Sequence, residues 1–300
     1  MLEPIFILGP TGCGKSRLAV ELAEQLGGAE IVSADAYQVY RQLPILTAAP
    51  GADLRRRVLH HLIGIMDVTE NNDAAVHARR AMAAIRDIQA RGHRPIVTGG
   101  SGLYVKFISH GISPAPPSDA ALRAQLDALP LAEAVARLRE LDPAGAERTD
   151  LQNPRYVRRN LEIVILGGKP LAYWQQNWNC PPAGPGFMLT RDTAELDARI
   201  ARRAHKMVSA GLVAEVAALG AGTGEKTLSP TAAKTLGLSL VRSHLAGELP
   251  LADMLSQLAL ITRQYAKRQR TWLRRETWLT PLPVGADTVE RILAAIGSGK

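Results

Sequence analysis

The sequence of 300 residues has little of the material that builds disulfide frameworks, cysteine zinc sites or membrane anchors. It contains two cysteines, Cys13 and Cys180, which are too few for several bridges or a four-cysteine zinc site. No run of about 18 consecutive apolar residues occurs, and no basic-then-apolar leader precedes the first apolar stretch. We therefore expect a cytoplasmic protein that does not associate with a membrane.

The sequence does contain enough apolar residues for a sizeable core, and an excess of basic ones. Hydrophobic residues make up 46% of the chain, which suits one large domain or two smaller ones. The formal net charge is +8 and the isoelectric point is near 9.8. Such a balance favours an anionic partner, and nucleic acid is one candidate.

The most specific motif lies near the amino terminus, where an apolar run leads into a glycine-rich loop and then a helical pattern. The loop has the spacing G-x-x-x-x-G-K-S of a phosphate-binding loop. In such loops backbone N–H groups turn toward an anion, the lysine reaches the terminal phosphate and the serine hydroxyl holds Mg²⁺. The motif predicts a site for a di- or triphosphate, with Ser16 as metal ligand, formed by Gly9, Pro10, Thr11, Gly12, Cys13, Gly14, Lys15 and Ser16.

A second predicted strand, residues 30–35, delivers Asp35 to the edge of the sheet that carries the phosphate loop. Strand C-termini share one edge in a parallel sheet. Spacing alone leaves two roles open for this carboxylate: general base, or magnesium ligand and N-cap. Tyr37 and Gln38 add hydrogen-bonding groups next to it, and Tyr40 fits either the site or the core.

Two histidines and a second glycine turn follow. His60 and His61 have no paired carboxylates at ligand spacing, which favours packed or hydrogen-bonded histidines over a metal site. A helix is expected over residues 73–91 and a strand over residues 94–98. That strand ends in the turn G-G-S-G at residues 99–102, and two glycine turns at strand ends predict a single crevice.

Prolines and a Pro/Gly-rich stretch separate residues 114–186 from the rest of the chain. We predict an α/β fold with a P-loop NTPase-like parallel sheet core and helices on both faces. Residues 1–113 and 187–300 would form this core with its C-terminal helices, and residues 114–186 a helical insertion domain. The last third of the chain is predicted to return to helices.

Two basic segments also carry aromatic residues, a combination that suits contacts to phosphates and stacking on bases. A solvated helix face is the alternative for both. The first segment opens a helical pattern in the insertion, and the second runs over residues 262–275. The residues concerned are Arg155, Tyr156, Val157, Arg158 and Arg159 in the first, and Arg263, Gln264, Tyr265, Lys267, Arg268 and Trp272 in the second.

Taken in order, the motifs closely resemble those of the tRNA dimethylallyltransferases, also called tRNA isopentenyltransferases, over nearly the whole chain. The family patterns are G-P-T-x-x-G-K-[ST], S-x-D-S-x-Q-V-Y, H-H-L-I, G-G-T-G-L-Y, R-x-x-R-A-L-E with G-K-P, R-I-x-x-R with G-L, and T-R-Q-x-A-K-R-Q-x-T-W. They correspond here to residues 9–16, 33–40, 60–63, 99–104, 155–162 with 168–170, 199–203 with 211–212, and 262–272.

The resemblance implies that N6 of adenosine 37, beside the anticodon, attacks C1 of dimethylallyl diphosphate and expels pyrophosphate. The phosphate loop would then hold the diphosphate of an isoprenoid donor, with Mg²⁺ as counter-ion, instead of ATP. The implied partners are the anticodon stem-loop of tRNA, contacted by the insertion, and dimethylallyl diphosphate. We expect the protein to act on them as a monomer.

The resemblance also implies a role for single residues. Asp35 is the expected base for the amine proton, Thr11 and Lys15 act in the loop, and Arg203 holds the pyrophosphate. The implied tRNA contacts are Asp35, Ala36, Tyr37, Gln38, Ser101, Arg123, Arg155, Tyr156, Val157, Arg158, Arg159, Arg263, Gln264, Lys267 and Arg268.

Four positions depart from the family pattern, and each loses a polar group near the substrate. The family has Ser, Lys, Arg and Tyr where this chain has Ala36, Ala49, Thr193 and Leu238. Because the residues of the loop, the base and the pyrophosphate arginine are present, we expect activity with weaker donor or tRNA binding. The zinc finger of some eukaryotic relatives is absent, which indicates a bacterial-type enzyme.

Three alternatives stay open. An adenylate isopentenyltransferase would act on free nucleotide and would need neither the insertion nor the basic aromatic run. A small-molecule P-loop kinase would use ATP and a hydroxyl acceptor, and would carry lid arginines in place of the G-G-S-G-L-Y turn. A non-catalytic RNA-binding module would not require both the phosphate loop and Asp35. The chain contains the insertion, the basic aromatic run, the G-G-S-G-L-Y turn, the phosphate loop and Asp35, so the tRNA transferase is the favoured interpretation.

Overall fold

The computed structural model describes residues 2–176, 178, 180–220 and 227–297 of the chain. These residues form two compact units. The first is made by the segments on either side of the second, up to Ser109 and from Pro182 onward, and the second spans His110–Pro181. The predicted insertion, residues 114–186, overlaps the second unit. The outer ends of the predicted core, residues 1 and 298–300, lie outside the described residues.

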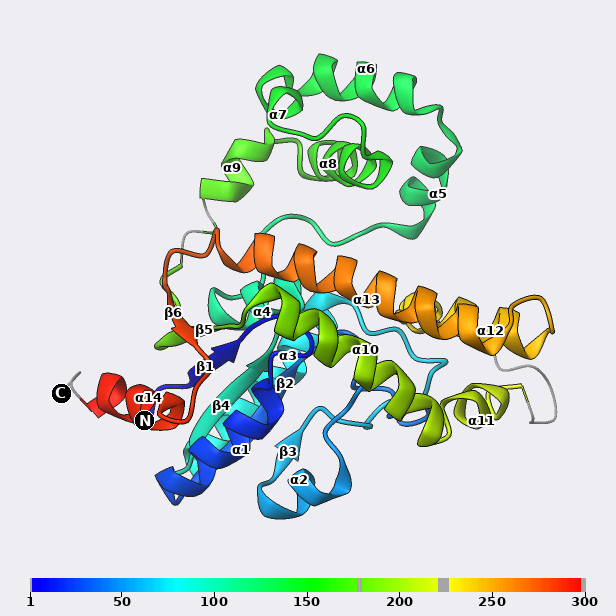
Figure 1. Ribbon diagram of the computed structural model, residues 1–300. Helices are drawn as coiled ribbons and strands as arrows, with labels where there is room; N and C mark the ends of the chain where they lie inside the picture. The colour runs from blue at the N-terminus through cyan, green and yellow to red at the C-terminus, as the bar shows by residue number, and fades with distance from the viewer. Residues whose placement is uncertain (1, 177, 179, 221–226, 298–300) are drawn as a thin grey trace. The chain divides into compact units, whose positions relative to one another are not determined.

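A six-stranded parallel sheet forms the centre of the first unit (Figure 1). Its spatial order is β3-β2-β4-β1-β5-β6, and every neighbouring pair is parallel. β1 lies inside the sheet and all its residues are fully buried, as expected for a strand covered on both faces. The predicted parallel α/β core is thereby confirmed. The strands are β1 (Ile5–Leu8), β2 (Ala29–Ala34), β3 (His60–His61), β4 (Arg94–Gly99), β5 (Gly186–Thr190) and β6 (Leu279–Pro283).

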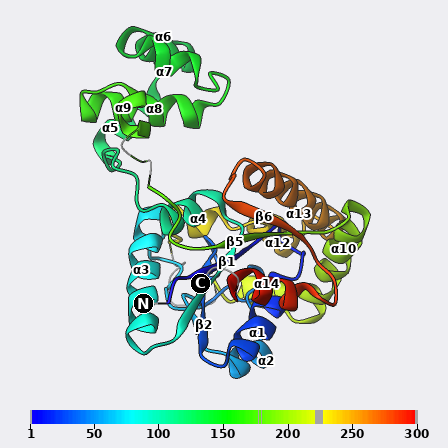
Figure 2. The same ribbon diagram turned by 90° about the vertical axis from the view of Figure 1, so that its left-hand side faces the viewer.

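Helices cover both faces of this sheet (Figure 2). The chain moves one way along the sheet from β1 to β2 and back from β3 to β4. Right-handed connections therefore place α1 on one face and α3 on the other. The apolar side chains of α1 and β1 share one core, in which Leu18 and Leu22 lie with Ile5 and Ile7. The helices are α1 (Lys15–Leu26), α2 (Ala52–Arg57), α3 (Ala74–Ala90), α4 (Gly102–Ser109) and α14 (Thr288–Gly297).

Further helices follow β5 and lead to the carboxyl edge of the sheet. The long helix α13 packs against α10, α12 and α4. Among the helices in the described part of the chain, none has the length and apolarity that a membrane crossing needs. These elements are α10 (Thr193–Ser209), α11 (Leu212–Ala217), the 3₁₀ helix Ala232–Lys234, α12 (Leu238–Leu245) and α13 (Leu251–Leu273).

The prediction that the last third is helical was wrong at β6, and β5, which lies just before that third, was not predicted. β6 contains Pro281 and Pro283, residues that argue against a strand because proline has no N–H for the ladder. Among the described residues β6 lies at the edge of the sheet and pairs with β5 alone, so one side of its backbone needs no donors. β3 was not predicted either, because a strand of two residues is too short to produce a recognisable pattern.

The second unit is a helical bundle with its own core. Val157 and Leu161 of α8 pack with Leu138 of α6 and Leu126 of α5. Asn153 caps α8 by accepting a hydrogen bond from the N–H of Arg155, and Pro154 follows at the first helical turn. The helices are α5 (Ala120–Ala128), α6 (Leu131–Leu141), α7 (Pro143–Glu147), α8 (Pro154–Gly167) and α9 (Leu171–Gln176).

Glu30, at the start of β2, joins three segments at the amino edge of the sheet. Its side chain is 6% exposed and accepts hydrogen bonds from His61 (2.7 Å), His93 (2.7 Å) and Arg91 (2.7 Å). Burial works to raise the pKa of Glu30, but the hydrogen bonds from Arg91, His61 and His93 outweigh it and lower the pKa to about 2. The ionised carboxylate thus stabilises the fold above the pKa that Glu30 has in the unfolded chain.

Glu30→Gln should lower the free energy of unfolding at pH 7 by roughly 2 kcal/mol, because a buried charged acceptor is lost. The folded-state pKa is depressed, so this difference should shrink as the pH falls from about 5 to about 3. Urea unfolding across this pH range measures it. Glu24→Gln is the matched control, since it removes an exposed partner of Arg57 and should change stability little. A deficit that stays constant down to pH 3 would contradict the assignment.

Candidate functional site

The glycine-rich loop lies between β1 and α1. Gly12 and Gly14 have φ angles of 86° and 105°, in the left-handed region that glycine adopts without strain. At Gly9 the reason is space, because an added Cβ would lie 2.9 Å from Cys13 Sγ and 3.0 Å from the Leu189 carbonyl. The loop can keep this shape only with glycine at these positions.

Three arginines from outside the loop bind three successive loop residues. Arg203 donates to Thr11 Oγ1, Arg199 to the Gly12 carbonyl and Arg191 to the Cys13 carbonyl, each at 2.8 Å. Lys15 donates to the Pro10 carbonyl, also at 2.8 Å. The three arginines come from α10 and the turn before it. Arg191 lies outside the predicted motifs, because it directly follows β5, a strand that was not predicted from the sequence.

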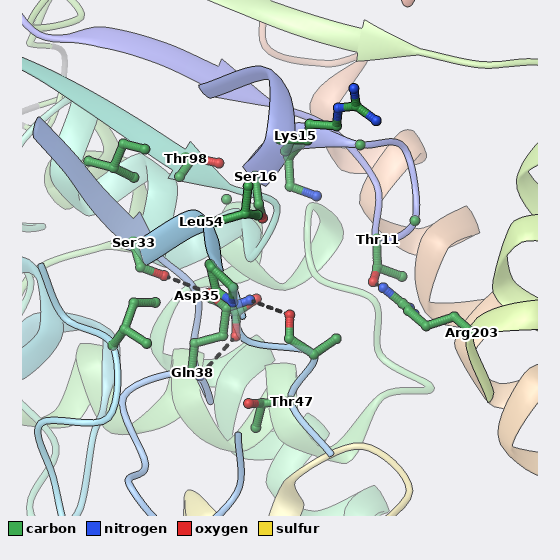
Figure 3. A pocket seen from close by; sticks show the side chains of 18 of the residues that line it. Thr11, Lys15, Ser16, Ser33, Asp35, Gln38, Thr47, Leu54, Thr98 and Arg203 are labelled. Carbon is green, nitrogen blue, oxygen red and sulfur yellow. Dashed lines mark hydrogen bonds between the residues drawn. The ribbon is translucent and has the colours of Figure 1, made fainter. Parts of the chain in front are cut away.

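A cavity of about 430 Å³ opens in front of this loop. Figure 3 shows Lys15, Ser16, Thr11 and Arg203 around the pocket that also contains Asp35. Among its charged lining residues, one carboxylate faces six cations, so the cavity suits a polyanion. Those residues are Asp35 against Lys15, Arg17, Arg199, Arg202, Arg203 and Lys206.

Asp35 directly follows β2, and the local backbone binds one of its two oxygens. Oδ1 accepts hydrogen bonds from the N–H groups of Tyr37 (2.9 Å) and Gln38 (3.3 Å). Within the described residues no hydrogen bond to Oδ2 is formed. Burial raises the pKa of Asp35, while the backbone hydrogen bonds and the charges of Lys15 and Arg203 oppose that rise. Asp35 therefore has one carboxylate oxygen without a hydrogen bond to the described residues at the cavity, and on balance its pKa is raised.

A smaller cavity of about 60 Å³ adjoins the first one. Thr11, Asp35 and Arg203 line both cavities, so the carboxylate lies where they meet. Most other side chains of the smaller cavity are apolar. They include Leu46, Ile200, Ala204, Met207, Leu236 and Leu258.

Helix α13 connects the phosphate loop with the second glycine turn. Gln269 accepts a hydrogen bond from the Thr11 N–H at 2.7 Å, and a Cβ on Gly100 would lie 2.5 Å from its Nε2. Tyr265 and Ser101 bind each other through their hydroxyls at 3.2 Å, and the Ser101 hydroxyl receives the Ala36 N–H at 3.4 Å. The two glycine turns and the Asp35 segment are thus held as one assembly.

The basic segment of α8 contains both exposed and bonded residues. Arg155 and Tyr156 are exposed, and the residue Tyr156 is 54% accessible. Val157 is fully buried in the core of its unit, so we leave it out of any nucleic-acid surface. Arg158 donates to the Leu129 carbonyl at 3.1 Å.

Glu162 binds two of the arginines that sequence analysis assigned to tRNA. Its carboxylate is 1% exposed and pairs with Arg123 and Arg159, each at 2.6 Å. Burial works to raise the pKa of Glu162, and hydrogen bonds from Arg159, Ser118 and Arg123 lower it on balance. Arg159 also donates to the Pro116 carbonyl at 2.6 Å, so these arginines stabilise the bundle.

The basic segment of α13 has Gln264, Lys267 and Arg268 exposed, with Arg263 half-buried. The guanidinium of Arg268 lies over the Tyr265 ring at 5.8 Å from its centre. This outer face carries cations, whereas Tyr265 on the inner side lines the smaller cavity.

Both predicted histidines are hydrogen-bonded, His60 to the Val58 carbonyl and His61 to Glu30. In the described residues no group of three or more His, Cys, Asp or Glu side chains is arranged to hold a metal ion. A metal in the cavity would therefore have few protein ligands. Mg²⁺ fits such a site, because it keeps several waters and takes its remaining ligands from phosphate oxygens and a single protein oxygen such as that of Ser16.

The four departures lie in different surroundings. Ala36 is buried beside Asp35, and Leu238 is buried where α12 begins. Thr193 accepts a hydrogen bond from Arg270 at 2.8 Å, so a guanidinium from α13 lies close to this position. Ala49 binds the Pro44 carbonyl through its N–H.

Known proteins resemble this chain along most of its length. The model of a family described as IPP transferase matches residues 38–276. The tRNA dimethylallyltransferase of Akkermansia muciniphila is 57% identical over 290 residues, which cover 97% of this chain and 96% of that relative.

Solved structures are similar as well. The full-length tRNA isopentenylpyrophosphate transferase of Bacillus halodurans has a TM-score of 0.72 at 30% identity, covering 99% of this chain and 96% of its own. A eukaryotic dimethylallyltransferase, described in crystallographic snapshots of its action on tRNA, has a TM-score of 0.84 at 24% identity. That match covers 99% of this chain and 79% of the eukaryotic one, and it concerns the fold alone.

Proposed function

This chain belongs to the IPP transferase family, which includes the tRNA dimethylallyltransferases, and we propose that it transfers a dimethylallyl group from dimethylallyl diphosphate to N6 of adenosine 37 in tRNA. One observation carries the assignment of the site: Asp35 lies where a cationic cavity and a small apolar cavity meet. A donor with an anionic head and a short apolar chain matches this pair of cavities.

The diphosphate would bind in the larger cavity, against the phosphate loop, Lys15 and Arg203. The five-carbon chain would enter the smaller cavity, against apolar side chains that include Ile200, Met207 and Leu258. This orientation brings C1 of the donor to the boundary between the cavities, next to Asp35. Burial of the chain away from water favours the donor over inorganic pyrophosphate.

In the reaction a C–N bond forms between N6 of the adenine and C1 of the donor, and the bond from C1 to the diphosphate oxygen breaks. An exocyclic adenine amine is a poor nucleophile, so Asp35 Oδ2 takes its proton during attack. The loop N–H groups, Lys15 and Arg203 stabilise the charge that develops on the leaving pyrophosphate. The adenine must leave its stack to reach this buried site.

Ser16 is the residue that would hold Mg²⁺ together with the diphosphate. When bound, the ion would neutralise charge on the leaving group. The protein groups already supply most of the positive charge around the cavity, since Lys15, Arg199 and Arg203 line it. We infer that the enzyme works in the cytoplasm as a monomer.

The tRNA would be held through the exposed cations of α13 and α8. Lys267→Ala, Arg268→Ala and Arg155→Ala should each raise the dissociation constant for tRNA. Each should also reduce the slope of log affinity against log salt by about 1, because a variant that has lost one phosphate contact releases fewer counterions when it binds. Filter binding or fluorescence anisotropy at several salt concentrations measures both quantities.

Arg79→Ala is the matched control for these variants, since it removes an equal charge from the exposed side of α3. It should leave affinity and salt slope unchanged. Equal effects of Arg79→Ala and Lys267→Ala would assign the result to net charge alone and would remove α13 from the binding face.

The proposed function is tested with dimethylallyl diphosphate labelled in its prenyl carbons, offered with tRNA and, separately, with AMP. Label should enter tRNA that has adenosine at position 37 and should not enter AMP or tRNA with another base there. Transfer should proceed without ATP. Label in AMP, or a requirement for ATP hydrolysis, would favour the adenylate transferase or kinase alternatives instead.

A further inference from the structure

Two fully buried polar side chains bind the backbone on both sides of Asp35. Asn72 and His77 are each 0% exposed, and they flank Asp73, the N-cap residue of α3, in the sequence. His77 Nε2 lies 2.8 Å from the Ser33 carbonyl, and Asn72 Nδ2 lies 3.1 Å from the Ala36 carbonyl. Neither residue belongs to the motifs discussed above, and neither lines a cavity that holds the proposed substrates.

The hydrogen positions of this pair follow from the acceptors around it. A carbonyl can only accept, so His77 Nε2 must carry a proton, and in a neutral ring Nδ1 then has a free lone pair. Asn72 Nδ2 lies 3.3 Å from Nδ1 and donates one hydrogen to it and the other to Ala36. Rotating the amide would place Asn72 Oδ1 against two acceptors. A single arrangement therefore pairs both ring nitrogens of His77 and both amide hydrogens of Asn72.

The neutral state of His77 is maintained by its surroundings. Burial lowers the pKa of His77 to about 4. The hydrogen bond to the Ser33 carbonyl opposes this shift, and the charge of Arg80 adds to it. The His77 ring meets Tyr104 edge-on at 5.2 Å, and the Tyr104 hydroxyl donates to the Asn72 carbonyl at 2.5 Å. Asn72 Oδ1 is buried without a partner among the described residues. An unpaired buried oxygen costs free energy, and the Asn72 amide accepts this cost because both of its hydrogens donate to other groups.

We propose that Asn72 and His77 are positioning residues for Asp35, which they hold by its flanking carbonyls so that Oδ2 faces the adenine amine. The inference rests on the base role of Asp35 in the proposed function. The carboxylate follows the last residue of β2, where the ladder no longer fixes the backbone. His77 binds the carbonyl of Ser33, the second-last residue of β2, and Asn72 binds the carbonyl of Ala36 beyond the end of the strand. Ser101 accepts the Ala36 N–H.

His77→Phe and Asn72→Ala test the proposal. Phenylalanine keeps a ring against Tyr104 but has no nitrogen, and alanine removes the amide. Each variant should lower the single-turnover rate of prenyl transfer by about tenfold or more at saturating donor and tRNA, since a small displacement of a reacting group is costly. Dissociation constants for donor and tRNA should stay within about twofold of the unaltered protein, because neither side chain touches them.

A double-mutant cycle with Asp35→Asn separates positioning from a general loss of stability. If His77 acts through the carboxylate, His77→Phe should add almost no further loss in the Asp35→Asn background. Ile88→Ala is the matched control, because it creates a cavity at another fully buried position of α3. It should lower the melting temperature and leave the rate at 25 °C unchanged.

Three outcomes would overturn the inference. These are a normal rate in both variants, an equal rate loss in Ile88→Ala, and a full additional loss from His77→Phe on top of Asp35→Asn. Should His77→Phe not fold, Asn72→Ala carries the cycle alone. A failure of the proposed function differs from all three, because the unaltered protein would then transfer no label to tRNA, or Asp35→Asn would be as fast as the unaltered protein.

Discussion

Asp35→Asn should slow the chemical step of prenyl transfer by about 10² or more while donor and tRNA bind almost normally. Asparagine keeps the shape of the side chain, and its amide oxygen can still accept from the backbone N–H groups of Tyr37 and Gln38. The amide cannot take a proton from the adenine amine. The loss should therefore appear in the single-turnover rate at saturating substrates and not in the dissociation constants.

Magnesium dependence separates this role from metal binding. If Asp35 were chiefly a metal ligand, asparagine would weaken donor binding in a metal-dependent way, and excess Mg²⁺ would restore part of the rate. Rates are therefore measured over a range of Mg²⁺ concentrations, with Asp87→Asn on the exposed side of α3 as a control of equal charge change. A rate near that of the unaltered protein, or rescue by metal, would remove Asp35 from the base role.

The pH profile gives a second readout for the same residue. Burial raises the pKa of Asp35, so in the unaltered protein the transfer rate should begin to fall at a pH above the usual aspartate range. The rate falls toward acidic pH because a general base must be deprotonated to act, and Asp35 becomes protonated as the pH falls through its pKa. Asp35→Asn should lack this acidic limb altogether.

The phosphate loop and Asp35 could be predicted from sequence because local rules govern them. The loop needs glycine at positions with positive φ, such as Gly12 and Gly14, and this need fixes the motif. The alternation of apolar strands and helical patterns then placed Asp35 at the end of β2, beside the loop. Both features depend on the chain within a few residues of themselves.

Contacts between distant segments could not be predicted in the same way. Arg123 and Arg159 are cations of the kind found on RNA-binding surfaces. Only the folded bundle shows that both of them pair with the buried Glu162. Asn72 and His77 lie outside every recognisable motif, and their distance in sequence from Ser33 and Ala36 hides their contact with the Asp35 segment. Pairing across the sheet likewise decides β6, whose prolines argue against a strand on local grounds.

Lys15→Ala should have an effect at least as large as that of Asp35→Asn, but of a different kind. The ammonium lies at the mouth of the loop, 2.8 Å from the Pro10 carbonyl, and can turn to a diphosphate oxygen. It would contact the diphosphate both before and during cleavage of the C–O bond. Its loss should therefore weaken donor binding and reduce the rate at saturation by about 10² to 10³.

Donor binding is measured by the rise in melting temperature that dimethylallyl diphosphate causes, which should be large in the unaltered protein and small in Lys15→Ala. Arg56→Ala, on the exposed side of α2, removes the same charge away from the loop and should keep the full shift. ATP should be neither consumed nor required in any of these reactions. Stoichiometric hydrolysis of ATP during transfer, or a normal rate for Lys15→Ala, would show that the loop does not hold the leaving diphosphate. Because Lys15 affects binding and rate together whereas Asp35 affects the rate alone, the two variants distinguish the group that holds the donor from the group that takes the proton.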